Sequence, residues 1–300
     1  MAAGELRLIR RRIRSVQSTM KITRAMELIA ASRIVKAEQR VQASRPYGER
    51  MAAVLGNLAA AAGGNVQHPL LEAREDVERS AVLVLCSDRG LCGAYNTNIF
   101  RLALRHIDGM DGGAHEVLAL GKKAEGFFSY RGYDVSRTWE MTDQPSYARA
   151  KEVAQHAMRR YLDGELDRID LVYTRFHSAF RQEVVAEPLL PIDPGALAEE
   201  EAARTEGTGP AVAPDTIFEP EPAVILGALV PNGVTSRIYS AALEASASEH
   251  ASRRRAMKAA TDNASDLIKA LQLEGNKARQ AAITTEILEV VGGAEALAAD

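Results

Sequence analysis

The sequence has 300 residues, of which 46% are hydrophobic, 26% are charged and only 5% are aromatic. This length and composition exclude a wholly disordered protein, and the scarcity of aromatic residues favours long helices over a β-sandwich. The net charge of −3 is distributed unevenly, because residues 1–50 hold twelve Lys and Arg against four Asp and Glu. A basic end of this kind indicates a charged partner.

Residues 1–62 are predicted to form one long helix, in which Pro46 is the single proline. A second partial stripe of apolar residues (Ile22, Met26 and Ile29) predicts that another surface contacts this helix. The main stripe repeats at steps of three and four and is uncharged at eleven of twelve positions, which is typical of a coiled-coil seam. Its members are Leu6, Ile9, Ile13, Val16, Met20, Thr23, Glu27, Ala30, Ile34, Ala37, Val41 and Ser44.

Residues 78–192 alternate short apolar runs with helical segments, which predicts a Rossmann-like α/β domain with a mostly parallel sheet and an antiparallel edge. The expected strands are 80–86, 115–120, 133–139, 169–176 and 182–190, and the expected helices are 97–107, 122–130 and 146–162.

The segment after the first strand lies where a nucleotide-binding glycine loop would be expected. Gly90 and Gly93 have the wrong spacing for such a loop, so a tight turn explains them better. Cys86 and Cys92 are too far apart for a thioredoxin-like pair, and the six histidines are scattered. These patterns predict no catalytic residue, no metal ligand and no cofactor site.

Residues 193–222 hold five prolines and eight acids against one base, which is typical of a solvated linker. Residues 223–295 are predicted to form the C-terminal coiled-coil helix, with Thr235 as a candidate N-cap and Gly292-Gly293 as its expected end. Between Thr235 and Val291 there is no proline, and Gly275 is the one internal helix breaker. The expected seam comprises Leu243, Ser246, His250, Arg253, Met257, Ala260, Ala264, Leu267, Leu271, Glu274, Ala278, Ala281, Thr285 and Leu288.

Two matching seams at opposite ends of one chain predict an antiparallel coiled coil. The longest stretch without Asp, Glu, Lys or Arg, Met51–Leu71, is interrupted by glycines and a proline, so no membrane span is expected. From the residues alone, the basic face of the first helix indicates a solvated coiled-coil surface or a bearing surface that meets an acidic protein ring. Two other functions stay open, a basic helical hairpin that binds nucleic acid or tethers other molecules, and an α/β enzyme with helical dimerisation arms.

Long motifs at both ends make the sequence resemble the gamma subunit of bacterial F-type ATP synthases. The matching segments are Lys21–Arg33 (KITRAMELIAASR), Arg45-Pro46-Tyr47, Asp88–Gly93 (DRGLCG), Ala256–Ala264 (AMKAATDNA) and Asn276–Glu286 (NKARQAAITTE). The resemblance implies a non-catalytic rotor shaft that transmits rotation of the membrane c-ring to the alpha/beta hexamer, couples proton flow to ATP synthesis and regulates ATPase activity.

The partners implied by the resemblance are the alpha and beta subunits, the epsilon subunit and the c-ring, with no nucleic acid and no cofactor. The positions implied to face the hexamer are Arg24, Met26, Arg279, Gln280, Thr284 and Glu286. Those implied to meet the ring or epsilon are Arg45, Tyr47, Phe218 and Glu219. Because the resemblance begins within a few residues of Met1, no transit peptide is expected. The implied location is the periphery of a bacterial cell membrane, on its cytoplasmic side.

Overall fold

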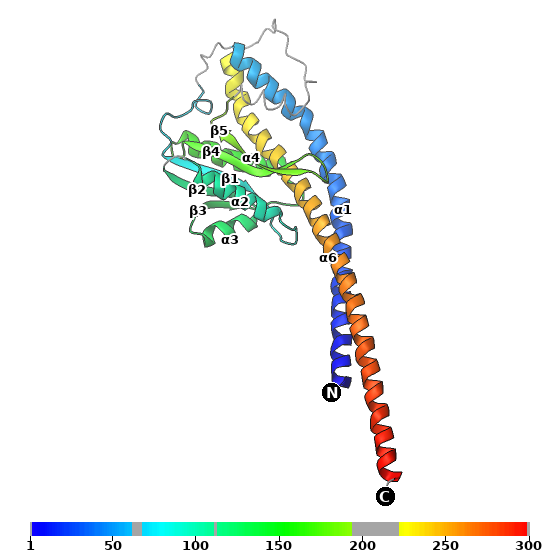
Figure 1. The fold of residues 1–300 in the computed structure, drawn as a ribbon. Helices are drawn as coiled ribbons and strands as arrows, with labels where there is room; N and C mark the ends of the chain where they lie inside the picture. The colour runs from blue at the N-terminus through cyan, green and yellow to red at the C-terminus, as the bar shows by residue number, and fades with distance from the viewer. Residues whose placement is uncertain (1, 62–67, 111–112, 194–221, 299–300) are drawn as a thin grey trace. The chain divides into compact units, whose positions relative to one another are not determined.

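The computed structural model describes residues 2–61, 68–110, 113–193 and 222–298. The chain divides into two compact units, a helical unit (Met1–Ala30 and Arg253–Asp300) and a globular unit (Ala31–Ser252). Two long helices, α1 (Ala2–Ala61) and α6 (Pro222–Ala298), contribute to both units (Figure 1).

In the helical unit, the start of α1 and the end of α6 lie side by side in opposite directions (Figure 1). The Oγ1 atoms of Thr23 and Thr261 are 2.8 Å apart. A methyl group added at Gly275 would lie 3.4 Å from Cγ2 of Ile9. Residue numbers therefore rise along α1 as they fall along α6, which confirms the predicted antiparallel pair.

The stripe predicted for α1 faces α6 in the helical unit. Ile9, Thr23, Glu27 and Ala30 are buried, whereas the arginines between them are exposed. Burying one apolar stripe and leaving the charged face in water is what stabilises such a pair.

The stripe predicted for α6 is wrong at Leu267 and Glu274, whereas its member Leu271 is buried as predicted. Leu267 is 40% exposed, whereas its neighbour Ile268 is 8% exposed and takes its place in the seam. Gly275 likewise replaces the exposed Glu274. Residues 267 and 268 are both apolar, so the spacing of apolar residues could not decide which of them lies in the seam. The burial of Ile268 in the structure decides it.

The cap at Thr235 and the end at Gly292-Gly293 that were predicted for the C-terminal helix are wrong, although the predicted range 223–295 lies within three residues of the observed one. The helix begins at Pro222, where a proline suits the first turn because its missing N–H would have no partner there. Thr235 lies within the helix, and its hydroxyl donates to the carbonyl of Pro231 at 2.9 Å, so it is no cap. Gly292 and Gly293 do not end the helix, which runs on to Ala298.

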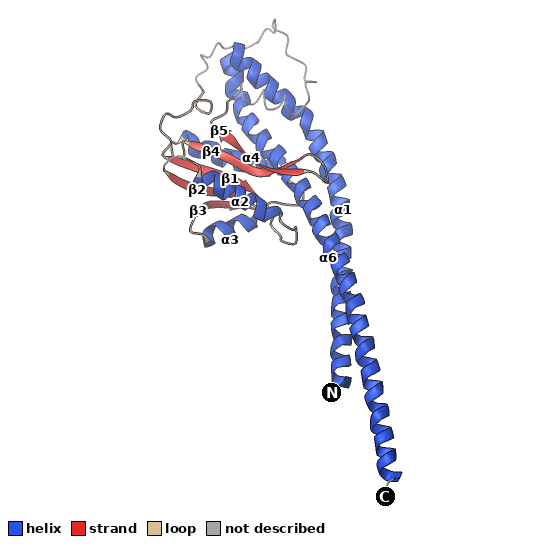
Figure 2. Cartoon of the chain, in the orientation of Figure 1, coloured by secondary structure: helices blue, strands red, loops and turns tan. Residues whose placement is uncertain are grey.

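The globular unit contains a five-stranded sheet in the order β3-β2-β1-β4-β5 (Figure 2). All neighbouring strands are parallel except β5, which pairs antiparallel with β4 and confirms the predicted antiparallel edge. The elements are β1 (Arg79–Leu85), α2 (Tyr95–Asp108), β2 (Ala114–Leu120), α3 (Lys122–Tyr130), β3 (Asp134–Trp139), α4 (Tyr147–Leu162), β4 (Arg168–Phe176) and β5 (Gln182–Leu190).

Helices cover both faces of this sheet, so its central strand is apolar from Ala81 to Leu85. Val82 and Val84 of β1 pack toward α2 and α3. Leu83 and Leu85, which point to the opposite face, pack with α4 and with the parts of α1 and α6 that belong to the globular unit. The two long helices are thus built into the core of the α/β domain.

Candidate functional site

The last part of α6 is an unpaired helical tip. The contacts between residues 9 and 275 and between 23 and 261 place Ala2, the first described residue of α1, at the level of residue 282. Residues 283–298 therefore extend about 24 Å past α1, at 1.5 Å per residue. Within this tip the exposed apolar residues are Ile283, Ile287, Leu288, Val290 and Val291.

A row of large apolar side chains on a helix that no other described residue pairs with is typical of a surface that binds a partner. The side chain of Val290 is 72% exposed and that of Leu288 is 66% exposed. The second stripe predicted on α1 behaves in the same way, since Ile22 and Ile29 are 59% and 53% exposed. Met26, between them, is half-buried.

The polar residues assigned to hexamer contact fall at two levels of the helical unit. Arg24 lies on α1, where its Nη1 donates to Glu27 Oε2 at 2.9 Å and so pairs a carboxylate that is buried in the seam. Arg279 lies on α6, 19 residues beyond the level of Arg24, which corresponds to about 28 Å along the helix axis. The structure therefore does not bring these two arginines together.

Around Arg279, the neighbouring predicted residues lie on the exposed surface of α6. Gln280, Thr284 and Glu286 are all exposed. The hydroxyl of Thr284 donates to the carbonyl of Gln280 at 3.0 Å, within the helix itself. The side chains of Arg279, Gln280 and Glu286 thus face solvent near the tip.

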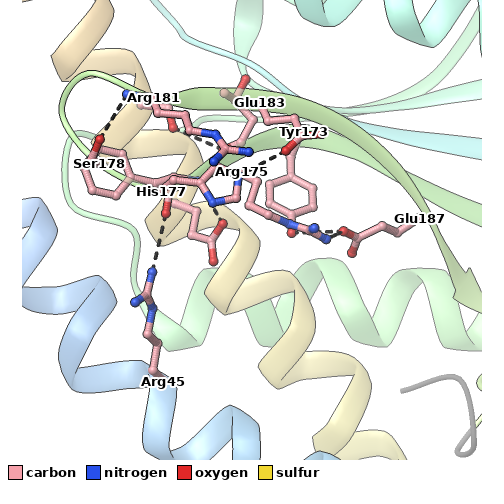
Figure 3. Close-up of polar contacts among 12 residues, drawn as sticks. Arg45, Tyr173, Arg175, His177, Ser178, Arg181, Glu183 and Glu187 are labelled. Carbon is pink, nitrogen blue, oxygen red and sulfur yellow. Dashed lines mark hydrogen bonds and ion pairs between the residues drawn. The ribbon is translucent and has the colours of Figure 1, made fainter. Parts of the chain in front are cut away.

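The residues assigned to the ring or to epsilon lie in the globular unit or outside the described residues. Tyr47 is 52% exposed. Arg45 reaches from α1 toward the turn between β4 and β5 (Figure 3), and its Nη2 donates to the carbonyl of Phe176 at 3.5 Å. Phe218 and Glu219 lie outside the described residues.

The turn between β4 and β5 is held by its own polar contacts (Figure 3). Ser178 Oγ accepts the backbone N–H of Arg181 at 3.1 Å, and His177 Nε2 lies 3.1 Å from Glu183 Oε2. Further along the two strands, Arg175 pairs with Glu187. These contacts fix the hairpin turn to which Arg45 reaches.

The carboxyl edge of the parallel strands is where α/β folds usually bind a ligand, at the point between β1 and β4 where the strand order reverses. In this chain α6 covers that edge. Tyr95, which follows β1, is 4% exposed, and its hydroxyl donates to the carbonyl of Ala245 at 3.0 Å. At the end of β4, the backbone N–H of Phe176 donates to Glu244 Oε2 at 3.0 Å.

The loop containing Gly90 and Gly93 at the same edge is tied to its neighbours. Asp88 Oδ1 accepts the backbone N–H groups of Lys122 and Met141, at 2.9 and 3.1 Å, which joins the loops that follow β1, β2 and β3. Burial raises the pKa of the Cys86 thiol, which disfavours the nucleophilic thiolate. The loop is therefore a structural junction.

Sequence analysis missed the contacts by which α6 closes the sheet edge. The segment 244–250, with the sequence EASASEH, is buried although five of its seven side chains are polar or titratable, namely Glu244, Ser246, Ser248, Glu249 and His250. A helical stretch that is rich in small and polar residues but contains no exposed position has to be hydrogen-bonded to its surroundings. Its alanine and serine content was the available signal.

None of the helices among the described residues has an apolar stretch long enough to cross a membrane. The described residues combine a pair of long helices that expose apolar side chains with an α/β domain whose usual ligand edge is contacted by α6, which is typical of a protein that binds partners through its surface.

Comparison with known proteins agrees with this class. A family model described as ATP synthase matches residues 5–297. The ATP synthase gamma chain of Mycolicibacterium gilvum is 44% identical, with 99% of each chain covered. That of Frankia casuarinae is 47% identical, again with 99% of each chain covered. The chain belongs to the ATP synthase gamma chain family, and as such it is a non-catalytic subunit.

Solved structures share the fold. A chain from the Euglena gracilis mitochondrial ATP synthase superposes with a TM-score of 0.66 at 21% identity, covering 98% of this chain and 95% of the other. A chain from the central stalk and c-ring structure of the Tetrahymena thermophila mitochondrial enzyme gives a TM-score of 0.56 at 24% identity, covering 80% and 99%. The comparisons give the nucleic-acid alternative no support.

Proposed function

We propose that this chain is the central rotor of a bacterial proton-translocating ATP synthase. It transmits rotation of the membrane c-ring to the alpha/beta hexamer and thereby couples proton flow to ATP synthesis and regulates ATPase activity. The observation that carries the proposal is the full-length relationship to gamma chains, combined with a paired helical shaft whose tip exposes large apolar side chains.

The helical unit is the part that enters the hexamer in this proposal. The exposed apolar tip of α6 suits a hydrophobic sleeve, because apolar contacts are non-directional and allow one surface to slide past another. Arg24 and Met26 contact the hexamer at one level, and Arg279, Gln280, Thr284 and Glu286 contact it about 28 Å away along the axis. The few polar contacts give the shaft a preferred orientation.

The globular unit is the base that meets the ring or epsilon, through Arg45 and Tyr47 and through Phe218 and Glu219. Its location is the cytoplasmic side of the cell membrane, at the periphery. The ATP chemistry belongs to the beta subunits.

Reconstitution tests the function directly. The purified chain is mixed with alpha and beta subunits from an actinobacterial relative, and ATP hydrolysis is measured for the chain, for the hexamer and for the mixture. The proposal expects no turnover by the chain alone and stimulation of the hexamer by the chain. Failure to associate with the hexamer, together with salt-sensitive binding of DNA or RNA, would replace the rotor with the nucleic-acid alternative.

The polar hexamer contacts are tested by the triple variant Arg24→Gln, Arg279→Gln and Gln280→Ala. We expect slower ATP synthesis and hydrolysis in the assembled enzyme, because the orientation-dependent contacts are lost. Arg24→Gln also removes the ion pair with the buried Glu27, so thermal unfolding of the variant chain shows whether it still folds. The matched control removes two exposed charges from α2 in the globular unit, Arg101→Gln with Arg105→Gln. Unaltered rates in the triple variant would show that these residues are not contacts.

A further inference from the structure

Asp143, in the loop that follows β3, is bound by both long helices. From α1, Arg33 Nη1 donates to its Oδ2 at 2.6 Å. From α6, Ser246 Oγ donates to its backbone carbonyl at 3.2 Å. One residue of the α/β domain therefore contacts both helices at once.

Phe176, at the end of β4, is bound by both helices as well. Its backbone N–H donates to Glu244 of α6 at 3.0 Å, and its carbonyl accepts from Arg45 of α1 at 3.5 Å. Its side chain is 3% exposed and lies in a small apolar cluster between the helices. The cluster is formed by Ile34, Ala37 and Val41 of α1 and by Leu243, Ala247 and Ala251 of α6.

Two more contacts join the sheet edge to α6. Ser248 Oγ donates to the carbonyl of Thr174 at 3.2 Å, and the hydroxyl of Tyr95 donates to the carbonyl of Ala245 at 3.0 Å. These contacts fix the domain to one helix of the pair. Asp143 and Phe176 differ from them because each binds both helices.

Attachment to both helices has a mechanical consequence. Packed helices slide past one another in small shear motions, so a force applied to one helix of a pair is partly lost as sliding. The two attachment points on α1, Arg33 and Arg45, are 12 residues apart, or about 18 Å along the helix. A domain attached to both helices, and at two separated points on one of them, turns the pair as a single body.

We propose that Asp143 and Phe176, each bound by α1 and α6, form the junction through which torque applied to the globular unit enters the helical shaft. This proposal rests on the rotor function proposed above and assigns the force-bearing contacts within it. Arg33, Ser246 and Glu244 are positioning residues, since they act on the geometry of the shaft and not on ATP.

The test compares a junction variant with a matched control in the complete enzyme. Arg33→Met with Ser246→Ala removes both helix contacts of Asp143 while leaving an apolar stem and a good helix former in their places. Lys36→Met with Ser240→Ala makes the same chemical changes on α1 and α6 without touching Asp143. Thermal unfolding of each purified chain establishes that both fold.

Two activity measurements distinguish the enzyme when torque passes through the globular unit (loaded) from the enzyme when none does (unloaded). In vesicles that contain the complete enzyme, ATP synthesis driven by a proton gradient sends torque through the globular unit into the shaft. ATP hydrolysis by the hexamer with this chain alone places no load on the globular unit. We expect the junction variant to lower the synthesis rate about fivefold to tenfold, from the loss of one ion pair and one hydrogen bond, and to leave unloaded hydrolysis at the control level.

The outcomes distinguish this proposal from the function on which it depends. Synthesis at the control level in the junction variant overturns the junction, as does an equal fall in synthesis and unloaded hydrolysis. Recovery with Arg33→Lys in place of Arg33→Met supports it, because lysine keeps the charge that Asp143 binds. Failure of the unaltered chain to stimulate the hexamer contradicts the rotor function itself.

Discussion

At the residue scale, the hydrogen bond between Thr23 and Thr261 fixes the register of the helical unit. The two hydroxyl oxygens are 2.8 Å apart, and each hydroxyl also lies close to a carbonyl of its own helix, Met20 for Thr23 and Met257 for Thr261. A polar pair matched across a mostly apolar seam specifies one register over its neighbours.

Valine substitutions test that register. Thr23→Val or Thr261→Val alone is expected to lower the free energy of unfolding by about 1 kcal/mol, since each leaves the other hydroxyl without its cross-helix partner. The double variant is expected to lose less free energy of unfolding than the two single variants lose together, because it leaves no unmatched hydroxyl. Chemical denaturation of the original protein, the two single variants and the double variant gives the coupling free energy between the two threonines. A coupling free energy of zero would contradict this contact.

At the element scale, α6 passes through three environments along its length. Residues 222–252 are packed within the globular unit, residues 253–282 pair with α1 in the helical unit, and residues 283–298 are unpaired. The amino-acid sequence changes accordingly, from small and polar residues at 244–250, through an apolar seam at 257–271, to exposed aliphatic residues beyond 282.

The parts of the fold that could be predicted from the sequence are those set by local patterns of burial. The strands and helices of the α/β domain were predicted within a few residues, because burial on both faces of a sheet imposes a pattern that is visible in the sequence. The seam of α6 was misassigned at Leu267 because Ile268 beside it is equally apolar. The available clue was the pair that follows, Glu274 and Gly275. A charged glutamate is poorly suited to a seam, so the glycine beside it was the better candidate for the seam position.

The contacts of Asp143 and Phe176 could not be predicted from spacing. They join residues more than 60 positions apart in the chain, and three of the four use backbone groups, whose chemistry is the same for every residue type. The site residues near the tip were named from family resemblance. Their exposure is described by the structure, and their contacts remain predictions.

The tip of α6 provides a prediction at this scale. Replacing Ile287 and Val291 with Asp is expected to leave the free energy of unfolding within about 0.5 kcal/mol of the original, because the two residues are 57% and 50% exposed and lie beyond the paired part of the helix. Affinity for the hexamer is expected to fall about tenfold.

Thermal unfolding and binding measurements check these two expectations together. Tyr130→Asp is the control, because Tyr130 is 92% exposed and lies in the globular unit, at the end of α3. Loss of stability in the tip variant, or hexamer affinity equal to that of the control, would show that the tip is not a binding surface.

At the scale of the whole molecule, the α/β domain serves as an attachment platform. The edge of the sheet that holds ligands in many α/β proteins is closed by α6 through Tyr95, Glu244 and Ser248. A fold widely used for catalysis is used here to bind two helices. This arrangement fits a subunit that moves other subunits and performs no chemistry of its own.

Direct observation of rotation tests the central claim. The hexamer is immobilised, and a probe is attached to the chain at Tyr130→Cys, a position that is 92% exposed, while the native cysteines Cys86 and Cys92 are buried and escape labelling. On addition of ATP we predict continuous rotation of the probe in one direction. A probe that stays fixed while the same complexes hydrolyse ATP would contradict the account.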